Sequence, residues 1–568
     1  MATIPELKRR IDQALGREKA DLVIKETRYL DIASGAIAEG DVAICGEKIV
    51  GAGERYEGTV EIDGRGKVVS PGFVDAHVHV ESTLVPPAEF DRCVLPRGTT
   101  TAICDPHEIA NVLGLEGLRF FLDSAPHLAM DLRVQLSSCV PATHLETSGA
   151  RLTAGDLLGL SDHPAVIGLA EMMNFPGVLF HDEEVLEKLV AFDGAHIDGH
   201  CPLVRGYELN AYASCGIRNC HESTSLEEAA EKLRKGLQVL IRDGSVSKDV
   251  DALSPLISER TWPFLAFCTD DRNPLDIALE GHIDHLIRKA IRNGAPVLPT
   301  YRAATWAAAR GFGLADRGLV APGQLADLVL LDDLEDCAVG TVIRRGQVVD
   351  EATFEGRAVP DPIGYGSIHL DPVTPDVFRV PAPGPSSAVI GVLPGKILTE
   401  HLHAELPYRD GLRHADPEHD LLKICVLARH GTNANVGRGF VKGFGFREGA
   451  LASSVGHDSH NVTVVGASDE DMAVAVNRLI ELQGGFVAVR GGQVLAELPL
   501  PIAGLMTELP FGDVRDRLLA LRQAVAALGC PLEEAFLQLA FLPLPVIPHL
   551  KITDRGLVDV DRFELVDA

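Results

Sequence analysis

Apolar strand-like segments and helix-like segments alternate eight times through the middle of this chain. The expected strands cover residues 68–80, 98–105, 131–139, 165–172, 195–201, 217–223, 238–245 and 264–271. Helical patterns follow most of them, as in SLEEAAEKLRKG after the sixth strand. Eight βα units in roughly 250 residues match the (β/α)8 TIM barrel, whose active site lies at the C-terminal ends of the strands. We therefore predict an α/β fold with this barrel at its centre.

Short β runs flank the alternation on both sides. They occupy residues 20–69 and return at residues 326–358, with Gly and Asp turns between them. A charged amphipathic helix is expected over about residues 1–22. The predicted division is a small β-sandwich domain from residues 1–69 plus 320–360, a barrel at 70–319, a linker rich in Pro and Gly at 361–391, and a C-terminal α/β domain at 392–568.

Composition excludes several classes of partner. A formal net charge of −29 argues against nucleic acid, because phosphate binding needs a basic surface. No apolar run approaches the roughly 18–20 residues that a membrane span needs, and the N-terminus lacks the apolar segment of a signal peptide. The 11 cysteines are scattered and form no CxxC pair. That pattern favours buried thiols in a reducing compartment, so we predict a cytoplasmic protein.

The first expected strand ends in two histidines. Residues 68–83 read VVSPGFVDAHVHVEST, which delivers His77 and His79 at the C-terminal end of a β-branched run. Residues i and i+2 of a strand point to the same side, so both imidazoles can bind one cation. An isolated HxH pair is more often a chance surface feature. The ligand types at the later strand ends favour a metal site here.

Ligand-type residues recur at the ends of later strands. Together with the HxH pair they give six candidates: His77, His79, Glu171, His200, His221 and Asp270. Spacing alone leaves open His196 in place of His200, Asp271 in place of Asp270, and a thiolate ligand at Cys220. Four histidines and two carboxylates at one barrel end would suit two adjacent divalent ions, with Mn, Fe or Zn preferred over Ca or Mg. Such a pair lowers the pKa of a shared water, and an Asp beside it can act as acid and base.

Further polar residues lie near the same predicted strand ends or in one C-terminal loop. The candidates for supporting or substrate-contacting roles are Asp105, His107, Glu108, Arg242, Ser245, Ser454, His457, Asp458 and His460. Helix capping would explain Asp105 before Pro106, but it leaves His107 and Glu108 unexplained. A polar turn would equally explain the loop SSVGHDSHN. Our hypothesis is that this loop covers the barrel mouth and contacts the substrate.

The order HxH, strand-4 carboxylate, His, His, Asp resembles the amidohydrolase superfamily. More closely, PGFVDAHVHVEST, GTTTAICDPHEIANVLG, FCTDDR and ASSVGHDSHNVTVVG are similar to the bacterial adenine deaminase family, and the likeness runs through essentially the whole chain. The resemblance implies hydrolysis of adenine to hypoxanthine and ammonia in purine salvage, with hydroxide attacking C6. It implies two divalent ions, Mn or Fe, with Zn as the alternative. Glu171 would bridge them, Asp270 would move protons, and His221 would complete the catalytic set. A homo-oligomer, such as a dimer, is also expected.

Four other interpretations differ in what they require of the sequence. Some cyclic amidohydrolases bridge their metals with a carboxylated lysine, but no lysine occurs between Lys67 and Lys188. Another amidohydrolase activity, on a related aminopurine or a cyclic amide, is the second candidate. A catalytically silent binding protein would be expected to have lost ligands, and none is missing. The HxE…PCxxC signature of the cysteine/histidine zinc deaminases is absent.

Overall fold

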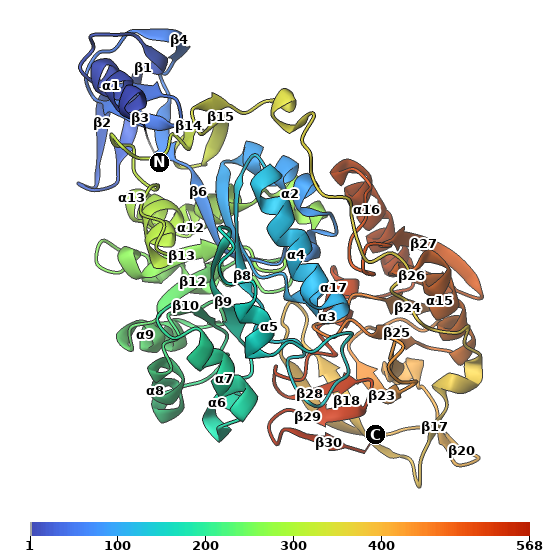
Figure 1. Cartoon of the computed structure of the whole chain (residues 1–568). Coiled ribbons are helices and arrows are strands. Elements are labelled where there is room, and N and C mark those ends of the chain that lie inside the picture. Colours follow the sequence, from blue (N-terminus) through green and yellow to red (C-terminus); the bar gives the residue numbers. More distant parts are fainter. Residues whose placement is uncertain (1–2, 568) are drawn as a thin grey trace.

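The computed structural model describes residues 3–567, and a TIM-barrel-like α/β unit lies at its centre (Figure 1). All eight predicted strands are present, although shorter than expected. They are β6 (Phe73–Val78), β7 (Thr99–Cys104), β8 (Asp131–Leu136), β9 (Val166–Met172), β10 (His196–Gly199), β11 (Asn219–Cys220), β12 (Gln238–Arg242) and β13 (Leu265–Cys268). They form a five-stranded parallel sheet, β10-β9-β8-β7-β6, and a three-stranded parallel sheet, β11-β12-β13.

Backbone hydrogen bonds connect the two sheets at both seams. Arg218 N donates to Ile197 O (2.9 Å) between the segments of β10 and β11. On the other side, Asp270 N donates to His77 O (3.0 Å), and His79 N donates to Asp270 O (3.2 Å). The second seam therefore fixes the backbone of three candidate ligands with respect to one another.

Helices follow the strands and cover their outer faces (Figure 1). They are α2 (Pro87–Val94), α3 (His107–Leu113), α4 (Leu115–Ser124), α5 (Ala154–Leu158), α6 (Phe175–Phe180), α7 (Glu183–Ala191), α8 (Gly206–Ser214), α9 (Leu226–Arg234), α10 (Val250–Leu253), α11 (Pro274–Leu279), α12 (Ile283–Arg292), α13 (Val297–Arg302) and α14 (Ala308–Gly311). Helix α12 shows why these helices pack against the strands. Its apolar residues Ile283, Leu286, Ile287 and Ala290 repeat at helical spacing, and all are buried in one cluster with strand residues.

The predicted strand 68–80 is wrong in one respect, because it is two strands. Strand β5 (Val68–Pro71) belongs to a different sheet, and the barrel strand β6 begins only after Gly72. A Cβ atom on Gly72 would lie 2.1 Å from Thr100 Oγ1, so this position is restricted to glycine by close packing. The chain crosses from one sheet to the other at this residue.

Strands from both flanks of the barrel share one eight-stranded sheet, in the order β16-β15-β14-β5-β1-β2-β3, with β4 beside β1. The additional strands are β1 (Ala20–Asp31), β2 (Ala36–Cys45), β3 (Lys48–Ala52), β4 (Gly58–Asp63), β14 (Leu328–Asp333), β15 (Ala338–Arg344) and β16 (Gln347–Val348). The leading helix α1 (Ile4–Ala14) exists but is shorter than predicted. It cannot continue to residue 22, because Gly16 adopts φ +65° and β1 starts at Ala20. Residues 1 and 2 of the predicted helix lie outside the described residues.

The C-terminal part is built on a second eight-stranded sheet, β19-β18-β23-β22-β25-β24-β26-β27. Its strands are β18 (Ser386–Val392), β19 (Thr399–Glu405), β22 (Leu422–Leu427), β23 (Val436–Lys442), β24 (Ala450–Ser453), β25 (Val462–Gly466), β26 (Gly485–Arg490) and β27 (Gln493–Pro499). Helices α15 (Asp469–Leu482), α16 (Phe511–Ala527) and α17 (Ala535–Ala540) accompany it. Small sheets join β17 (Val380–Pro381) to β20 (Tyr408–Arg409) and β21 (Leu412–Arg413), and β28 (Leu550–Thr553) to β29 (Gly556–Asp559) and β30 (Glu564–Val566).

The barrel and the C-terminal part share a continuous apolar core. One buried cluster includes Val94 and Phe121 from barrel helices together with Phe446 and Leu521 from the C-terminal part. Figure 1 shows the C-terminal elements lying along one side of the barrel. Within residues 3–567, no helix has the length and apolarity needed to cross a membrane.

Candidate metal centre

The six candidate ligands predicted from the sequence converge at the C-terminal ends of the barrel strands. His77 lies in β6 and Glu171 in β9, whereas the other four follow strands β6, β10, β11 and β13 directly. All six are buried, with at most 6% of any residue exposed: His77, His79, Glu171, His200, His221 and Asp270. Parallel strands end at one edge of their sheet, so residues far apart in sequence meet there.

Glu171 is the central residue, because its two carboxylate oxygens face two different pairs of histidines. Oε1 lies 3.6 Å from His77 Nε2 and 3.3 Å from His79 Nε2. Oε2 lies 2.7 Å from His200 Nδ1 and 3.2 Å from His221 Nε2. Asp270 Oδ1 joins the first pair, at 3.5 Å from His77 Nε2 and 3.1 Å from His79 Nε2. A carboxylate placed between two groups of ligands has the geometry of a bridging residue.

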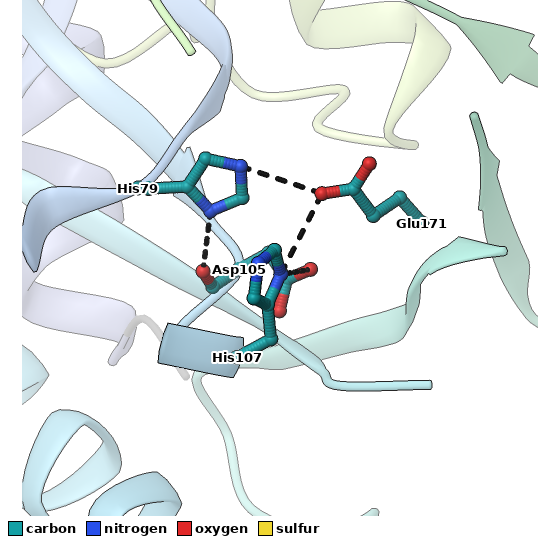
Figure 2. Close-up of side chains that lie close together, drawn as sticks. All are labelled: His79, Asp105, His107 and Glu171. Atoms are coloured by element: carbon teal, nitrogen blue, oxygen red, sulfur yellow. Dashed lines mark hydrogen bonds and ion pairs between the residues drawn. The ribbon is translucent and has the colours of Figure 1, made fainter. Parts of the chain in front are cut away.

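The hydrogen bonds around His79 define the state of its ring. Nδ1 lies 3.0 Å from the backbone oxygen of Asp105 (Figure 2). A carbonyl can only accept, so Nδ1 carries the proton. In the neutral ring, Nε2 then presents its lone pair to the carboxylates of Glu171 and Asp270. An imidazole oriented by a carbonyl, with its free nitrogen directed at anionic ligands, is typical of a metal ligand.

Both central carboxylates are held in the ionised form. Burial disfavours the charge on Glu171, but the nearby His221 and His200 outweigh it, and the pKa of Glu171 lies well below its ordinary value. Burial likewise opposes ionisation of Asp270. There, the Arg242 guanidinium donates from Nη1 to Oδ2 (2.8 Å), and the pKa of Asp270 also lies well below its ordinary value. Anionic oxygens and imidazole nitrogens form a donor set that suits Mn, Fe or Zn.

The alternatives left open by spacing are separated by geometry. His200 lies beside Glu171, whereas the His196 ring packs against Phe312 with 4.5 Å between ring centres. Asp270 faces the HxH pair, whereas Asp271 Oδ1 accepts a hydrogen bond from Ser82 (2.5 Å).

Two further residues weighed from the sequence point away from the six candidates. Cys220 Sγ lies 3.5 Å from Cys201 Sγ and 3.4 Å from Lys232 Nζ. Lys188, the first lysine after Lys67, donates from its buried amine to the backbone oxygen of Ser138 (2.6 Å). Neither residue is positioned to bind the ions with Glu171.

Most of the supporting candidates also gather here. His107 Nδ1 lies 2.8 Å from Asp105 Oδ2 and 3.5 Å from Glu171 Oε1 (Figure 2). Glu108 contacts His457 Nδ1 (2.5 Å) and His460 Nε2, both from the loop between β24 and β25. The predicted C-terminal loop therefore does reach the barrel mouth.

Two candidates, Ser245 and Ser454, form hydrogen bonds with other parts of the chain and not with the cluster. Ser245 Oγ accepts from the backbone N–H of Asn273 (3.0 Å), at the start of α11. Ser454 Oγ donates to Gly504 O (2.6 Å) and accepts from Gly485 N (2.7 Å), so it ties together segments of the C-terminal part.

Sequence reasoning missed two carboxylates. Glu222 forms an ion pair with Arg242 and lies 3.8 Å from His221 Nε2. Asp198 Oδ2 lies 3.9 Å from His77 Nδ1, and neither atom has a hydrogen-bond partner. Glu222 directly follows the candidate ligand His221 in the sequence, so it could have been proposed as a site residue from its position. Asp198 lies inside a strand, where nothing in the pattern distinguishes it from a structural residue.

A small cavity with about 20 Å³ of free volume adjoins the cluster. One side carries five of the candidate ligands with His107 and Glu108, and the apolar side carries Met173, Ile397, Phe541 and Leu544. His457 and Asp458 from the C-terminal loop also line it, as do Glu222, Arg242 and Asp271.

Comparison with known proteins gives matches over nearly the whole chain. Residues 68–349 match the Amidohydrolase family, and residues 396–564 match the Adenine deaminase C-terminal domain. A protein named adenine deaminase from Cereibacter sphaeroides is 60% identical over 98% of this chain and 98% of its own length. Proteins of the same name from Methylobacterium nodulans and Brucella anthropi are 60% and 59% identical, each covering 99% of this chain. The matched regions cover 99% and 100% of the lengths of these two relatives.

Proposed function

Because this chain belongs to the adenine deaminase family, within the amidohydrolases, we propose that it catalyses the hydrolytic deamination of adenine to hypoxanthine and ammonia. The observation that carries this proposal is the full-length match at about 60% identity, which includes both the barrel and the C-terminal domain. A match confined to the barrel would have supported only the broader class of amidohydrolases.

We propose that two divalent ions, Mn or Fe with Zn as the alternative, are held by the six converging residues: His77, His79, Glu171, His200, His221 and Asp270. The ionised Glu171 between two pairs of imidazoles supports this assignment. Bound there, such ions would supply Lewis acidity and lower the pKa of a water molecule. The protein's own contribution is to fix the ligand orientations and to exclude bulk water.

We infer that Asp270 moves the protons of the reaction. Arg242 donates to its Oδ2, and its Oδ1 faces His77 and His79. Hydrolysis at C6 of adenine requires that water lose a proton and that the exocyclic amine gain one before it leaves as ammonia. A carboxylate beside both atoms can transfer this proton. We assign the catalytic roles to Asp270, Glu171 and His221.

Several finer features belong to the same proposal. The two parallel sheets would close into a complete (β/α)8 barrel, since hydrogen bonds cross both seams. The domains would follow the predicted ranges, of which residues 1, 2 and 568 lie outside the described residues. A homodimer and a cytoplasmic location also remain proposals. All eleven cysteines, each of them within the described residues, are free, as expected in a reducing compartment.

The direct test is turnover of adenine by purified, Mn-loaded protein, followed by ammonia release and by the ultraviolet change to hypoxanthine. We expect turnover in the wild type and its loss in Glu171→Gln and Asp270→Asn. The exposed Glu187→Gln on α7 is the matched control and should retain activity. Full metal occupancy of the Glu171 centre without turnover of adenine would reject the substrate, and related aminopurines and cyclic amides would then be tested.

A further inference from the structure

A second group of metal-ligand side chains lies beside the centre described above and uses none of its six residues. His107 and Glu108 begin α3 of the barrel, whereas His457 and Asp458 come from the loop between β24 and β25. One ligand atom from each lies within 4.8 Å of the other three, and every residue is at most 2% exposed. We propose that these four residues bind an additional divalent transition-metal ion that joins the C-terminal domain to the barrel.

The hydrogen bonds of His107 direct a lone pair into this group. Asp105 Oδ1 accepts from Ser137 Oγ (2.8 Å), and its Oδ2 lies 2.8 Å from His107 Nδ1. An ionised carboxylate only accepts, so Nδ1 donates, and Nε2 of a neutral ring has a free lone pair. That lone pair faces Glu108 Oε1 at 3.2 Å and Asp458 Oδ1 at 3.5 Å. Three electron-rich atoms at these distances repel one another unless a cation lies between them.

Glu108 is also oriented by a contact on the carboxylate oxygen that points away from the group. His460 Nδ1 accepts from the backbone N–H of Gly456 (3.2 Å), so the proton of the neutral ring is on Nε2, which faces Glu108 Oε2. The other oxygen, Oε1, is buried and directed at the group, with His457 Nδ1 2.5 Å and His107 Nε2 3.2 Å away. Asp458 Oδ2 is also buried and unpartnered. A supporting contact on the outer atom of a carboxylate, as at Glu108 Oε2, is characteristic of metal ligands.

The fourth ligand is held by packing. The ring of His457 stacks on Phe541, with 4.4 Å between ring centres and 9° between planes. This contact fixes the ring so that Nδ1 lies 2.5 Å from Glu108 Oε1 and 3.9 Å from Asp458 Oδ1. In a tetrahedral site with ligand bonds of about 2.0–2.2 Å, neighbouring ligand atoms are roughly 3.3–3.6 Å apart. The separations of His107 Nε2 from Glu108 Oε1 and Asp458 Oδ1 lie near that range, whereas the contact between His457 Nδ1 and Glu108 Oε1 is shorter and would lengthen when an ion binds.

The donor set, two imidazoles and two carboxylates, suits Zn, Mn or Fe. Each domain supplies two ligands, so the ion would fix the C-terminal loop over the cavity that adjoins the centre. The alternative is a metal-free network in which His107 is protonated and donates to the two carboxylates. The two alternatives differ by one ion per chain, whatever the substrate proves to be.

Anomalous diffraction at the metal absorption edge, on crystals of the full-length wild type, tests the proposal without a mutation. We expect two peaks around Glu171 and a third between Glu108 and His457. Peaks confined to the Glu171 centre would overturn the proposal. Because the readout is a position, failure of the adenine assay would not affect it.

Metal analysis of purified variants is the second test. Wild type should carry three ions per chain, and Asp458→Asn and His457→Gln should carry two. Ser459→Ala, on the same loop but with no ligand removed, is the matched control and should keep three. A wild-type content of two, or three ions retained in both ligand variants, would refute the third site.

Discussion

Lys551 provides the most quantitative prediction of the structure. It lies in β28, is fully buried, and donates from Nζ to Ile397 O (2.7 Å) and Phe541 O (3.0 Å). Burial lowers the pKa of its amine from 10.5 to about 7. Ile397 and Phe541 line the cavity beside the metal centre, so Lys551 supports the apolar side of the site from behind.

The lowered pKa makes stability depend on pH in a defined direction. Between about pH 7 and 10.5 the unfolded chain holds a proton on Lys551 that the folded chain has lost. Stability contributed by this residue therefore rises with pH across that window. The fall in pKa from 10.5 to about 7 corresponds to a change of roughly 5 kcal/mol in the free energy of unfolding over the whole window. From pH 7.5 to 9.5 the expected change is about 2 kcal/mol.

The perturbation is Lys551→Met, which removes the titrating amine but keeps most of its volume. We expect the free energy of unfolding of wild type, relative to this variant, to rise by about 2 kcal/mol from pH 7.5 to 9.5. The assay is urea unfolding followed by circular dichroism at each pH. Lys442→Met, at an exposed lysine in β23, is the control and should show no such trend. A difference between wild type and Lys551→Met that is constant with pH would refute the reasoning.

Two further predictions concern the barrel. Asp198→Asn should weaken metal binding by roughly 10–100-fold, because it removes the charge facing His77 Nδ1. Metal titration of the apoprotein measures the affinity, and an unchanged affinity would exclude a role of Asp198 in orienting His77. Gly72→Ala should lower the free energy of unfolding by about 1–3 kcal/mol through the clash with Thr100. Gly384→Ala, where the added methyl group meets open space, is the control and should not lower it. Equal melting temperatures of the two variants would contradict the packing argument.

The convergence of the candidate ligands was predictable from the sequence because it follows from local rules. The i, i+2 spacing of His77 and His79 places both rings on one side of a strand, and parallel strands place their C-terminal ends together. Those rules gave the location of Glu171, His200 and Asp270 without any knowledge of tertiary contacts. They could not choose between His200 and neighbouring candidates, because that choice depends on which side of a strand end faces the axis.

The remaining features depend on contacts that no short pattern encodes. The pairing of Glu108 with His460 joins residues 352 positions apart. The split at Gly72 follows from the proximity of Thr100, which belongs to a neighbouring strand. Ser454 lies in a motif dense in hydrogen-bonding groups, yet its hydroxyl only connects backbone segments of the C-terminal part. Composition showed that this loop was unusual, but not which of its residues face the barrel.

The charges around the cavity bear on both of the proposed metal sites. Among the described residues that line it, the carboxylates are Glu108, Glu171, Glu222, Asp270, Asp271 and Asp458, and the one permanently charged base is Arg242. So many buried anions are costly unless cations compensate them. Two divalent ions would balance the side around Glu171, whereas Glu108 and Asp458 at the domain junction face only imidazoles. An ion at the junction would therefore stabilise the closed C-terminal loop directly, and chelation should loosen this interface before the barrel itself unfolds.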